Sequence, residues 1–164
     1  MGALKRFELW LSMTRVGTWL VKKVGTKLDP VVFRLSGGRF TSLGPVIIPQ
    51  LLLTSTGRKS GEPREAQLAY TDVDGLIHIV ASNFGGERHP AWSYNLMAQP
   101  RASVLLRGRS LEVNAELLSD EEKEAVWQRL VDNVSNYDAY RERTDRNIKV
   151  YRLQPIEEST GQKA

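Results

Sequence analysis

The chain has 164 residues, of which 41% are hydrophobic and 26% charged, with a net charge of +4 and a pI near 9.5. This length fits one domain with a sizeable core, and the mildly basic balance suits an anionic ligand or membrane surface without indicating nucleic acid. The absence of cysteine excludes disulfides, thiolate metal sites and a cysteine nucleophile, and two histidines are too few for a histidine-rich metal site.

An amphipathic helix is expected over residues 1–26. Apolar residues, with Trp10 and Trp19 among them, recur at helical spacing, and lysines and arginines lie between them. Such a helix either contacts the inner face of the cell membrane or packs its apolar stripe on the domain or on a second subunit. No run approaches the roughly 20 apolar residues of a membrane span and no signal peptide is visible, so we expect a cytoplasmic protein.

The rest of the chain predicts short elements joined by tight turns. The predicted strands cover residues 39–43, 46–53, 66–73, 76–82, 102–106, 110–117 and 147–153. A helix over 27–34 starts at Asp29-Pro30, and a second runs from Pro90 to about Ala98 and is capped by His89 or a neighbour. A third helix starts with a capping box of Ser119 and Glu122. Because tight turns join most strands, we expect a mainly antiparallel sheet of about six or seven strands, closed into a small barrel with surrounding helices, in the α+β class. A flexible tail over 157–164 would follow this domain of residues 27–156.

Two loops carry groups that could bind an anion. The first reads Gly57-Arg58-Lys59-Ser60-Gly61-Glu62-Pro63-Arg64, and its three cations outweigh its one carboxylate. Cationic side chains and backbone amides together can bind phosphate or carboxylate oxygens, although a solvated surface turn has the same composition. The second loop, Ser82-Asn83-Phe84-Gly85-Gly86, leads into the helix near Pro90, where free amides suit an anion or ring oxygens.

The usual catalytic motifs are absent from the sequence. There is no Gly-x-Ser-x-Gly elbow and no His-Glu-x-x-His, and the first loop lacks the spacing of a Walker phosphate loop. What remains is a set of ligand-binding groups without an intrinsic nucleophile. That pattern is typical of an enzyme whose cofactor supplies the chemistry, or of a binding module.

Three motifs in a fixed order are more specific. They are Leu53-Thr54-x-Thr56-Gly57-Arg58-Lys59-Ser60-Gly61-x-Pro63-Arg64, then Ala81-Ser82 followed by Arg88-His89-Pro90-Ala91-Trp92-x-x-Asn95-Leu96, then Tyr137-x-x-Tyr140-x-x-x-Thr144-Asp145-Arg146. Together they resemble the deazaflavin-dependent nitroreductase family, the actinobacterial flavin/deazaflavin oxidoreductases with a split β-barrel fold. The resemblance covers roughly residues 30 to 155.

The resemblance implies that reduced coenzyme F420 is the hydride donor, with FMN a less suitable ligand because the basic tip suits a longer anionic tail. On this sequence, the implied cofactor-binding residues are Thr56, Arg58, Lys59, Ser60, Arg64, Ser82, Asn83, Gly85, Gly86 and Trp92. Arg58, Lys59, Ser60 and Arg64 would bind the phosphate and glutamate tail, the loop with Ser82, Asn83 and the amides around Gly85 and Gly86 would line the ring side, and Trp92 would form a pocket wall. Tyr137 corresponds to a family tyrosine that orients substrate or supplies a proton, and Tyr140 to a neighbouring pocket tyrosine.

Some positions depart from the family pattern on the substrate side. Asn83-Phe84 stands where better-known members have a lysine after the serine, and Val134 and Arg143 replace aromatic residues. The resulting hypothesis is an oxidoreductase that passes a hydride to a small electron-poor acceptor, namely a quinone, an enone or a nitro compound. The alternatives are a non-catalytic deazaflavin binder or carrier, and an anion-binding module at a membrane surface; either a monomer or a homodimer is compatible with all three.

Overall fold

The computed structural model describes residues 26–38, 40–41, 44–45 and 48–156. The amphipathic helix expected at the N-terminus and the tail expected over 157–164 lie outside these residues. Among the residues described, no helix is both long enough and apolar enough to cross a membrane.

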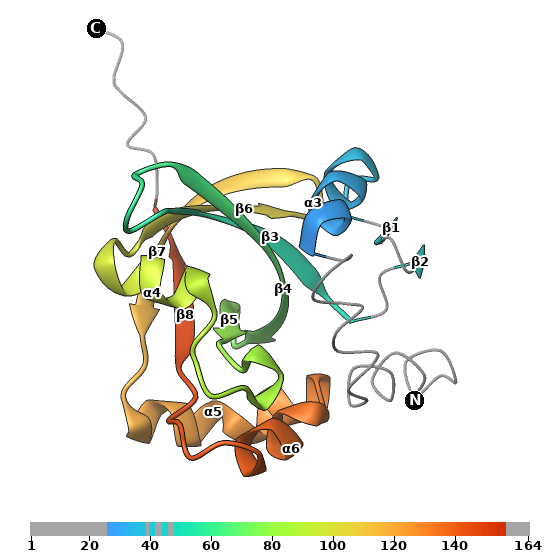
Figure 1. The fold of residues 1–164 in the computed structure, drawn as a ribbon. Helices are drawn as coiled ribbons and strands as arrows, with labels where there is room; N and C mark the ends of the chain where they lie inside the picture. The colour runs from blue at the N-terminus through green and yellow to red at the C-terminus, as the bar shows by residue number, and fades with distance from the viewer. Residues whose placement is uncertain (1–25, 39, 42–43, 46–47, 157–164) are drawn as a thin grey trace, which may run out of the picture.

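Six of the described strands close into an antiparallel barrel (Figure 1). They are β3 (Gln50–Thr56), β4 (Pro63–Val73), β5 (Leu76–Val80), β6 (Arg101–Leu106), β7 (Arg109–Leu117) and β8 (Val150–Pro155). The order around the barrel is β3-β4-β5-β8-β7-β6, and pairing of β3 with β6 closes it. Closure leaves no free sheet edge, which is how a small antiparallel sheet avoids unpaired backbone groups. The predicted α+β barrel is therefore confirmed.

The apolar residues of the strands form two buried clusters. Alternate residues such as Leu51 and Leu53 of β3 point into the barrel, where they meet Ile79, Val104 and Leu153. The opposite faces of β5 and β8 contribute to a second cluster that the helices cover. That cluster is formed by Val80, Leu118, Trp127, Leu130, Val134, Tyr137, Tyr140, Ile148 and Val150.

Helices pack on three parts of the barrel. Figure 1 shows α5 (Asp120–Asn133) and α6 (Asn136–Glu142) together below it, and α4 (Ala91–Ala98) beside the turn between β3 and β4. The helix α3 (Thr26–Leu35) packs against β3 and β4, and a two-residue ladder of β1 (Phe40–Thr41) and β2 (Gly44–Pro45) follows it. A single 3₁₀ turn, η2 (Asn83–Gly85), precedes α4.

The first hairpin is longer and its turn tighter than expected. Thr54 pairs with Glu65 and Thr56 with Pro63, so the turn itself covers only residues 57–62. The N–H of Gly57 donates to the carbonyl of Glu62 at 2.8 Å, which extends the ladder to the base of the turn. Arg64 therefore projects from a strand, whose backbone the ladder holds, and not from a loop.

Other element boundaries also differ from the predictions. The N-cap of α4 is Pro90, the neighbour of His89, and not His89 itself; the helix therefore begins at Ala91, and no side chain bonds its start. Pro30 lies inside α3 and does not mark its first turn. The strands expected to end at residue 82 and to begin at residue 147 are shorter, because the barrel ladder between β5 and β8 spans only Ile77 to Val80 on one side.

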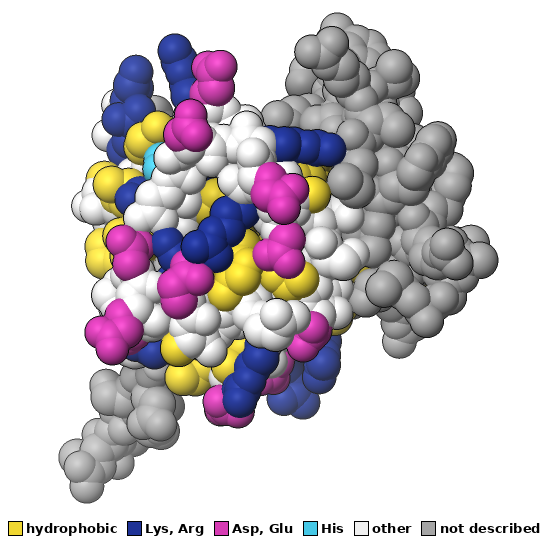
Figure 2. All heavy atoms as spheres, turned by 90° about the horizontal axis from the view of Figure 1, so that it is seen from below, with side chains coloured by type: hydrophobic (Ala, Val, Ile, Leu, Met, Phe, Trp, Pro, Cys, Tyr) yellow, Lys and Arg dark blue, Asp and Glu magenta, His cyan; other side chains and the backbone are white. Residues whose placement is uncertain are grey.

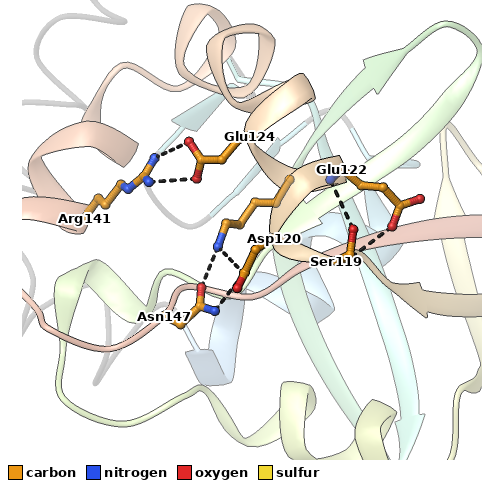
Figure 3. Close-up of polar contacts among 7 residues, drawn as sticks. Ser119, Asp120, Glu122, Glu124, Arg141 and Asn147 are labelled. Carbon is orange, nitrogen blue, oxygen red and sulfur yellow. Dashed lines mark hydrogen bonds and ion pairs between the residues drawn. The ribbon is translucent and has the colours of Figure 1, made fainter.

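The capping box of α5 is confirmed. The N–H of Glu122 donates to Oγ of Ser119 at 3.2 Å, and the N–H of Ser119 donates to Oε2 of Glu122 at 2.9 Å (Figure 3). This reciprocal pair satisfies two backbone groups that a helix start otherwise leaves without partners. The face that carries α5 and α6 shows acidic and basic side chains intermixed (Figure 2), so it does not form a patch of one sign.

Candidate functional site

A pocket of about 600 Å³ lies between the turn of the first hairpin and α4. We refer to it as the basic pocket. Its lining consists of Gly57, Arg58, Lys59, Ser60, Arg64, Glu65, Ala66, Arg88, His89, Ala91, Trp92, Tyr94 and Asn95. Five of the predicted cofactor-binding residues, Arg58, Lys59, Ser60, Arg64 and Trp92, therefore share one cavity although they come from two separate motifs.

Positive charge dominates the basic pocket. Arg58, Lys59, Arg64 and Arg88 are all exposed on its walls. The one carboxylate there, that of Glu65, is ion-paired with Arg34 of α3, which removes most of its repulsion toward an anion. Four cations converging on one cavity can bind several phosphate or carboxylate groups at once. The donor set therefore fits a ligand with an extended anionic tail.

A buried asparagine holds the two walls of the basic pocket together. Asn95 of α4 is only 6% exposed. Its Oδ1 accepts from the backbone N–H of Arg58 at 3.1 Å, and its Nδ2 donates to Oγ of Ser55 at 3.1 Å. The sequence placed Asn95 in a motif but gave it no function; a polar residue on the apolar face of a short helix was the available signal. Buried amides of this kind specify one arrangement of the chain because their groups must be paired.

Replacing this asparagine should loosen the pocket. We expect Asn95→Ala to lower the free energy of unfolding by about 1–3 kcal/mol, because the N–H of Arg58 loses its acceptor and Oγ of Ser55 loses the N–H that donates to it. Urea denaturation measures the change. Asn114→Ala on the exposed face of β7 is the matched control and should change stability by less than about 0.5 kcal/mol. Equal effects of the two substitutions would show that Asn95 does not hold the walls together.

The ring of Tyr94 on α4 contacts side chains from both walls of the basic pocket. The guanidinium of Arg58 lies over the ring of Tyr94, 4.9 Å from its centroid. The ring of His89 meets the same tyrosine edge-on at 5.7 Å. A cation over an aromatic face is held electrostatically without losing its charge. Arg58 is thus restrained at its backbone by Asn95 and at its guanidinium by Tyr94.

The second loop has an unusual left-handed backbone. Asn83, Phe84 and Gly85 have φ angles of 47°, 58° and 72°, and such residues in succession are costly unless their surroundings hold them. Nδ2 of Asn83 donates to the carbonyl of Arg88 at 2.8 Å. The ring of Phe84 packs edge-on against that of Tyr140 at 5.8 Å. The loop is therefore anchored both to the start of the α4 segment and to α6.

Arg146, from the segment before β8, binds the backbone of this loop. Arg146 donates to three backbone carbonyls, those of Ala81 at 3.0 Å, Ser82 at 2.8 Å and Gly86 at 3.1 Å. It also contacts Nδ1 of His89 at 2.7 Å. The sequence included Arg146 in its third motif without assigning it a function, since the bonds join residues about 60 positions apart.

The two predicted catalytic tyrosines lie elsewhere in the fold. Tyr137 and Tyr140 share one face of α6, as the spacing predicted, and both are buried in the second cluster. Burial, together with the nearby Tyr140, raises the pKa of Tyr137 well above its ordinary value, so its hydroxyl keeps its proton. Among the described residues, neither tyrosine lines the basic pocket.

The other predicted residues divide between these two regions. Thr56 ends β3 beside the basic pocket and pairs with Pro63. Ser82, Asn83, Gly85 and Gly86 belong to the left-handed loop, which contacts α6 and not, within the described ranges, the basic pocket. The predicted set is thus split into a cationic cavity and a loop-and-tyrosine region, with Arg146 and His89 between them.

Comparison with known proteins gives consistent matches over most of the chain. A family model described as F420H(2)-dependent quinone reductase matches residues 29–155. The F420H(2)-dependent quinone reductase Rv1261c of Mycobacterium tuberculosis is 33% identical over 141 residues, which cover 82% of this chain and 95% of that protein.

Solved structures agree with the sequence matches. An F420-H2 dependent reductase, FDR-A, aligns with a TM-score of 0.60 and 34% identity over 66% of this chain and 99% of its own. A structure described as a domain-swapped dimer aligns with a TM-score of 0.62 and 31% identity over 76% of this chain and 95% of its own.

Proposed function

Since the chain belongs to the F420H(2)-dependent quinone reductase family, it is an oxidoreductase that uses coenzyme F420, and we propose that its acceptor is a quinone. The match to the quinone reductase family supports the acceptor, and the basic pocket, in which four cations converge beside Trp92, supports binding of the anionic coenzyme. When bound, the reduced deazaflavin supplies a hydride to the acceptor. The protein's own contribution is to bind the coenzyme, to orient the acceptor beside it and to exclude water.

The residues of the basic pocket suit the tail of this coenzyme. We propose that Arg58, Lys59 and Arg64 bind its phosphate and glutamate carboxylates, with Ser60 as a neutral donor between them. Oγ of Ser60 accepts from Nη2 of Arg64 at 3.2 Å, which leaves its own proton free for a ligand oxygen. On the ring side, we propose contacts from Thr56, Trp92 and the loop that contains Ser82, Asn83, Gly85 and Gly86.

A titration with two flavins tests the proposal. We expect oxidised coenzyme F420 to bind with micromolar affinity by fluorescence, and FMN to bind more weakly because it offers fewer anionic groups to the four cations. Turnover with the reduced coenzyme should then be faster with a quinone than with an enone or a nitroaromatic compound. Tighter binding of FMN, or binding without reduction of any acceptor, would overturn the proposal and favour the non-catalytic carrier.

Tyr137 is proposed to stabilise the oxyanion that forms on the reduced quinone. Its position supports this role, because its ring packs against that of Tyr140, which in turn contacts Phe84 of the loop proposed for the ring side. Tyr137→Phe should lower kcat for quinone reduction by about 10²-fold while the Kd for coenzyme F420 changes little. The control is Tyr70→Phe, which removes a buried hydroxyl from the barrel core. Equal losses in kcat and in cofactor affinity would reject this role for Tyr137.

Tyr140 lies beside Tyr137 on α6 and is proposed as the second tyrosine of the substrate pocket.

Two further predictions concern partners. A solved relative is described as a domain-swapped dimer, which supports a homodimer as the form to test by light scattering. Contact of the N-terminal helix with a membrane surface stays a prediction, since that segment lies outside the described residues.

A further inference from the structure

Arg146 connects the basic pocket to the segment that precedes β8. Its neighbour Asn147 is held at the start of α5, where its Nδ2 donates to Oδ1 of Asp120 at 2.8 Å (Figure 3). Nζ of Lys123 bonds both of these residues, at 2.5 Å to Asn147 and 2.8 Å to Asp120. The backbone on which Arg146 sits is therefore fixed, and its guanidinium reaches the left-handed loop and His89 from a defined position.

The contact between Arg146 and His89 determines where the imidazole carries its proton. A guanidinium has only donors, so Nη1 of Arg146 donates and Nδ1 of His89 accepts. The proton of a neutral ring must then lie on Nε2. The only other histidine, His78, has the opposite arrangement, because its Nδ1 lies 2.9 Å from the carbonyl oxygen of Leu76 and must donate to it.

We infer that Arg146 is a positioning residue of the basic pocket: it fixes His89 in the Nε2–H tautomer, so that His89 presents a neutral N–H donor to a phosphate or carboxylate oxygen in that pocket. His89 lines the pocket while its Nδ1 accepts from Arg146, so Nε2, on the other side of Cε1 in the same rigid ring, is the nitrogen that can donate to a ligand. The same guanidinium donates to the carbonyls of Ser82 and Gly86, so one side chain holds the backbone of the loop and also determines the tautomer of His89. The ligand part of this inference rests on the proposed function; the tautomer part does not.

The charges around His89 favour its neutral form. The charged and titratable groups around it are Arg146 and Lys149 from the segment before β8, Arg88 next to it in the chain, and Tyr94 of α4, over whose ring Arg58 of the hairpin turn lies. Partial burial lowers the pKa of His89 below its ordinary value, and the positive charges of Arg146 and Lys149 lower it further. Because the folded pKa lies below the usual value of about 6.5, His89 stays neutral above that pH and charges only as the pH falls below it.

Nitrogen NMR of the imidazole rings tests the tautomer directly. In the ¹⁵N-labelled full chain at pH 7.5, without ligand, long-range proton–nitrogen spectra should show one ring protonated at Nδ1 and one at Nε2. A His78→Gln variant assigns the two rings, and the ring that remains should be the Nε2–H form. A remaining ring protonated at Nδ1, or one that exchanges between the two forms, would overturn the inference without any ligand being present.

Cofactor titrations then test the donor and its dependence on Arg146. His89→Phe, which keeps a ring but removes the N–H donor, should weaken binding of oxidised coenzyme F420 by roughly threefold to tenfold, the value of one hydrogen bond. In Arg146→Met, the pKa of His89 should rise toward about 6.5. A plot of affinity against pH should then show a step near that value, because the protonated imidazole attracts the anionic coenzyme and binding becomes tighter as the pH falls. The double variant Arg146→Met/His89→Gln has no imidazole at this position and should lack the step. Subtracting its affinity profile from that of Arg146→Met removes any effect of titrating the coenzyme itself.

The outcomes separate the two proposals. If the wild-type chain shows the Nε2–H ring but does not bind coenzyme F420, the proposed function fails and the positioning of His89 stands. If the coenzyme binds and the pH profiles of Arg146→Met and the double variant coincide, the function stands and the positioning role is rejected. Should Arg146→Met not fold, Arg146→Lys replaces it: the three donors of an ammonium sit on one nitrogen and cannot reach the three carbonyls and His89 together, so exchange between the tautomers is expected.

Discussion

Gly85→Ala is expected to lower the free energy of unfolding by about 2–5 kcal/mol, the largest effect on stability that a single methyl group should have in the described part of this chain. A Cβ at this position would lie 2.9 Å from both the carbonyl oxygen of Tyr140 and Cβ of Arg143. The backbone also has a φ of 72°, which side chains rarely adopt. The loop and α6 would have to separate, and both carry residues proposed to act in the reaction.

Gly61→Ala provides the matched control for this prediction. Its φ is also 72°, but no atom lies within 4 Å of an added Cβ. It should therefore show only the conformational cost, about 1–2 kcal/mol. Urea denaturation of both variants measures the difference, which reports the contact between the loop and α6. If the two variants lose equal stability, the close packing of Gly85 against Tyr140 is not significant for the fold.

Removing the cations of the first hairpin should have the largest effect on ligand binding. We expect Lys59→Ala and Arg64→Ala each to weaken binding of coenzyme F420 by about tenfold, and the double variant by about a hundredfold, since each loses a charge-assisted hydrogen bond. Affinity should also depend less on salt concentration in the double variant, because fewer charges attract the tail. Fluorescence titration at two ionic strengths measures both effects.

The second basic hairpin supplies the control for charge alone. Arg109 lies in the β6–β7 hairpin, and the register places it at the opposite end of β3 from residues 57–62, because Ser55 pairs with Ala102 and Leu52 with Leu105. Arg109→Ala removes the same charge and should leave the affinity within about twofold. A loss as large as that of Lys59→Ala would mean that net charge, and not the basic pocket, determines binding.

Much of the architecture follows from signals that act over a few residues. The capping box of Ser119 and Glu122 begins α5 because both bonds close within one helical turn. The apolar run Leu51-Leu52-Leu53 before a glycine turn predicts a strand, and all three leucines are buried in it. The glycines of the first loop indicate a turn, since Gly61 needs the left-handed backbone. The boundary errors arose where a ladder extended past the local signal, as it does from Thr54 to Thr56, or ended short of it, as β5 does at Val80.

The sequence by itself determined the antiparallel barrel, the basic turn and the pair of tyrosines on α6, because turn chemistry, apolar alternation and helical spacing are local properties of the chain. Only the tertiary structure decided that Asn95 fastens α4 to the backbone of Arg58, 37 residues away, and that Arg146 binds His89, 57 residues away. These contacts leave no periodic pattern in the sequence. They exist because pairing of β3 with β6 brings α4 to the first hairpin, and pairing of β5 with β8 brings the segment of Arg146 to the loop after β5, where buried polar groups must then be paired.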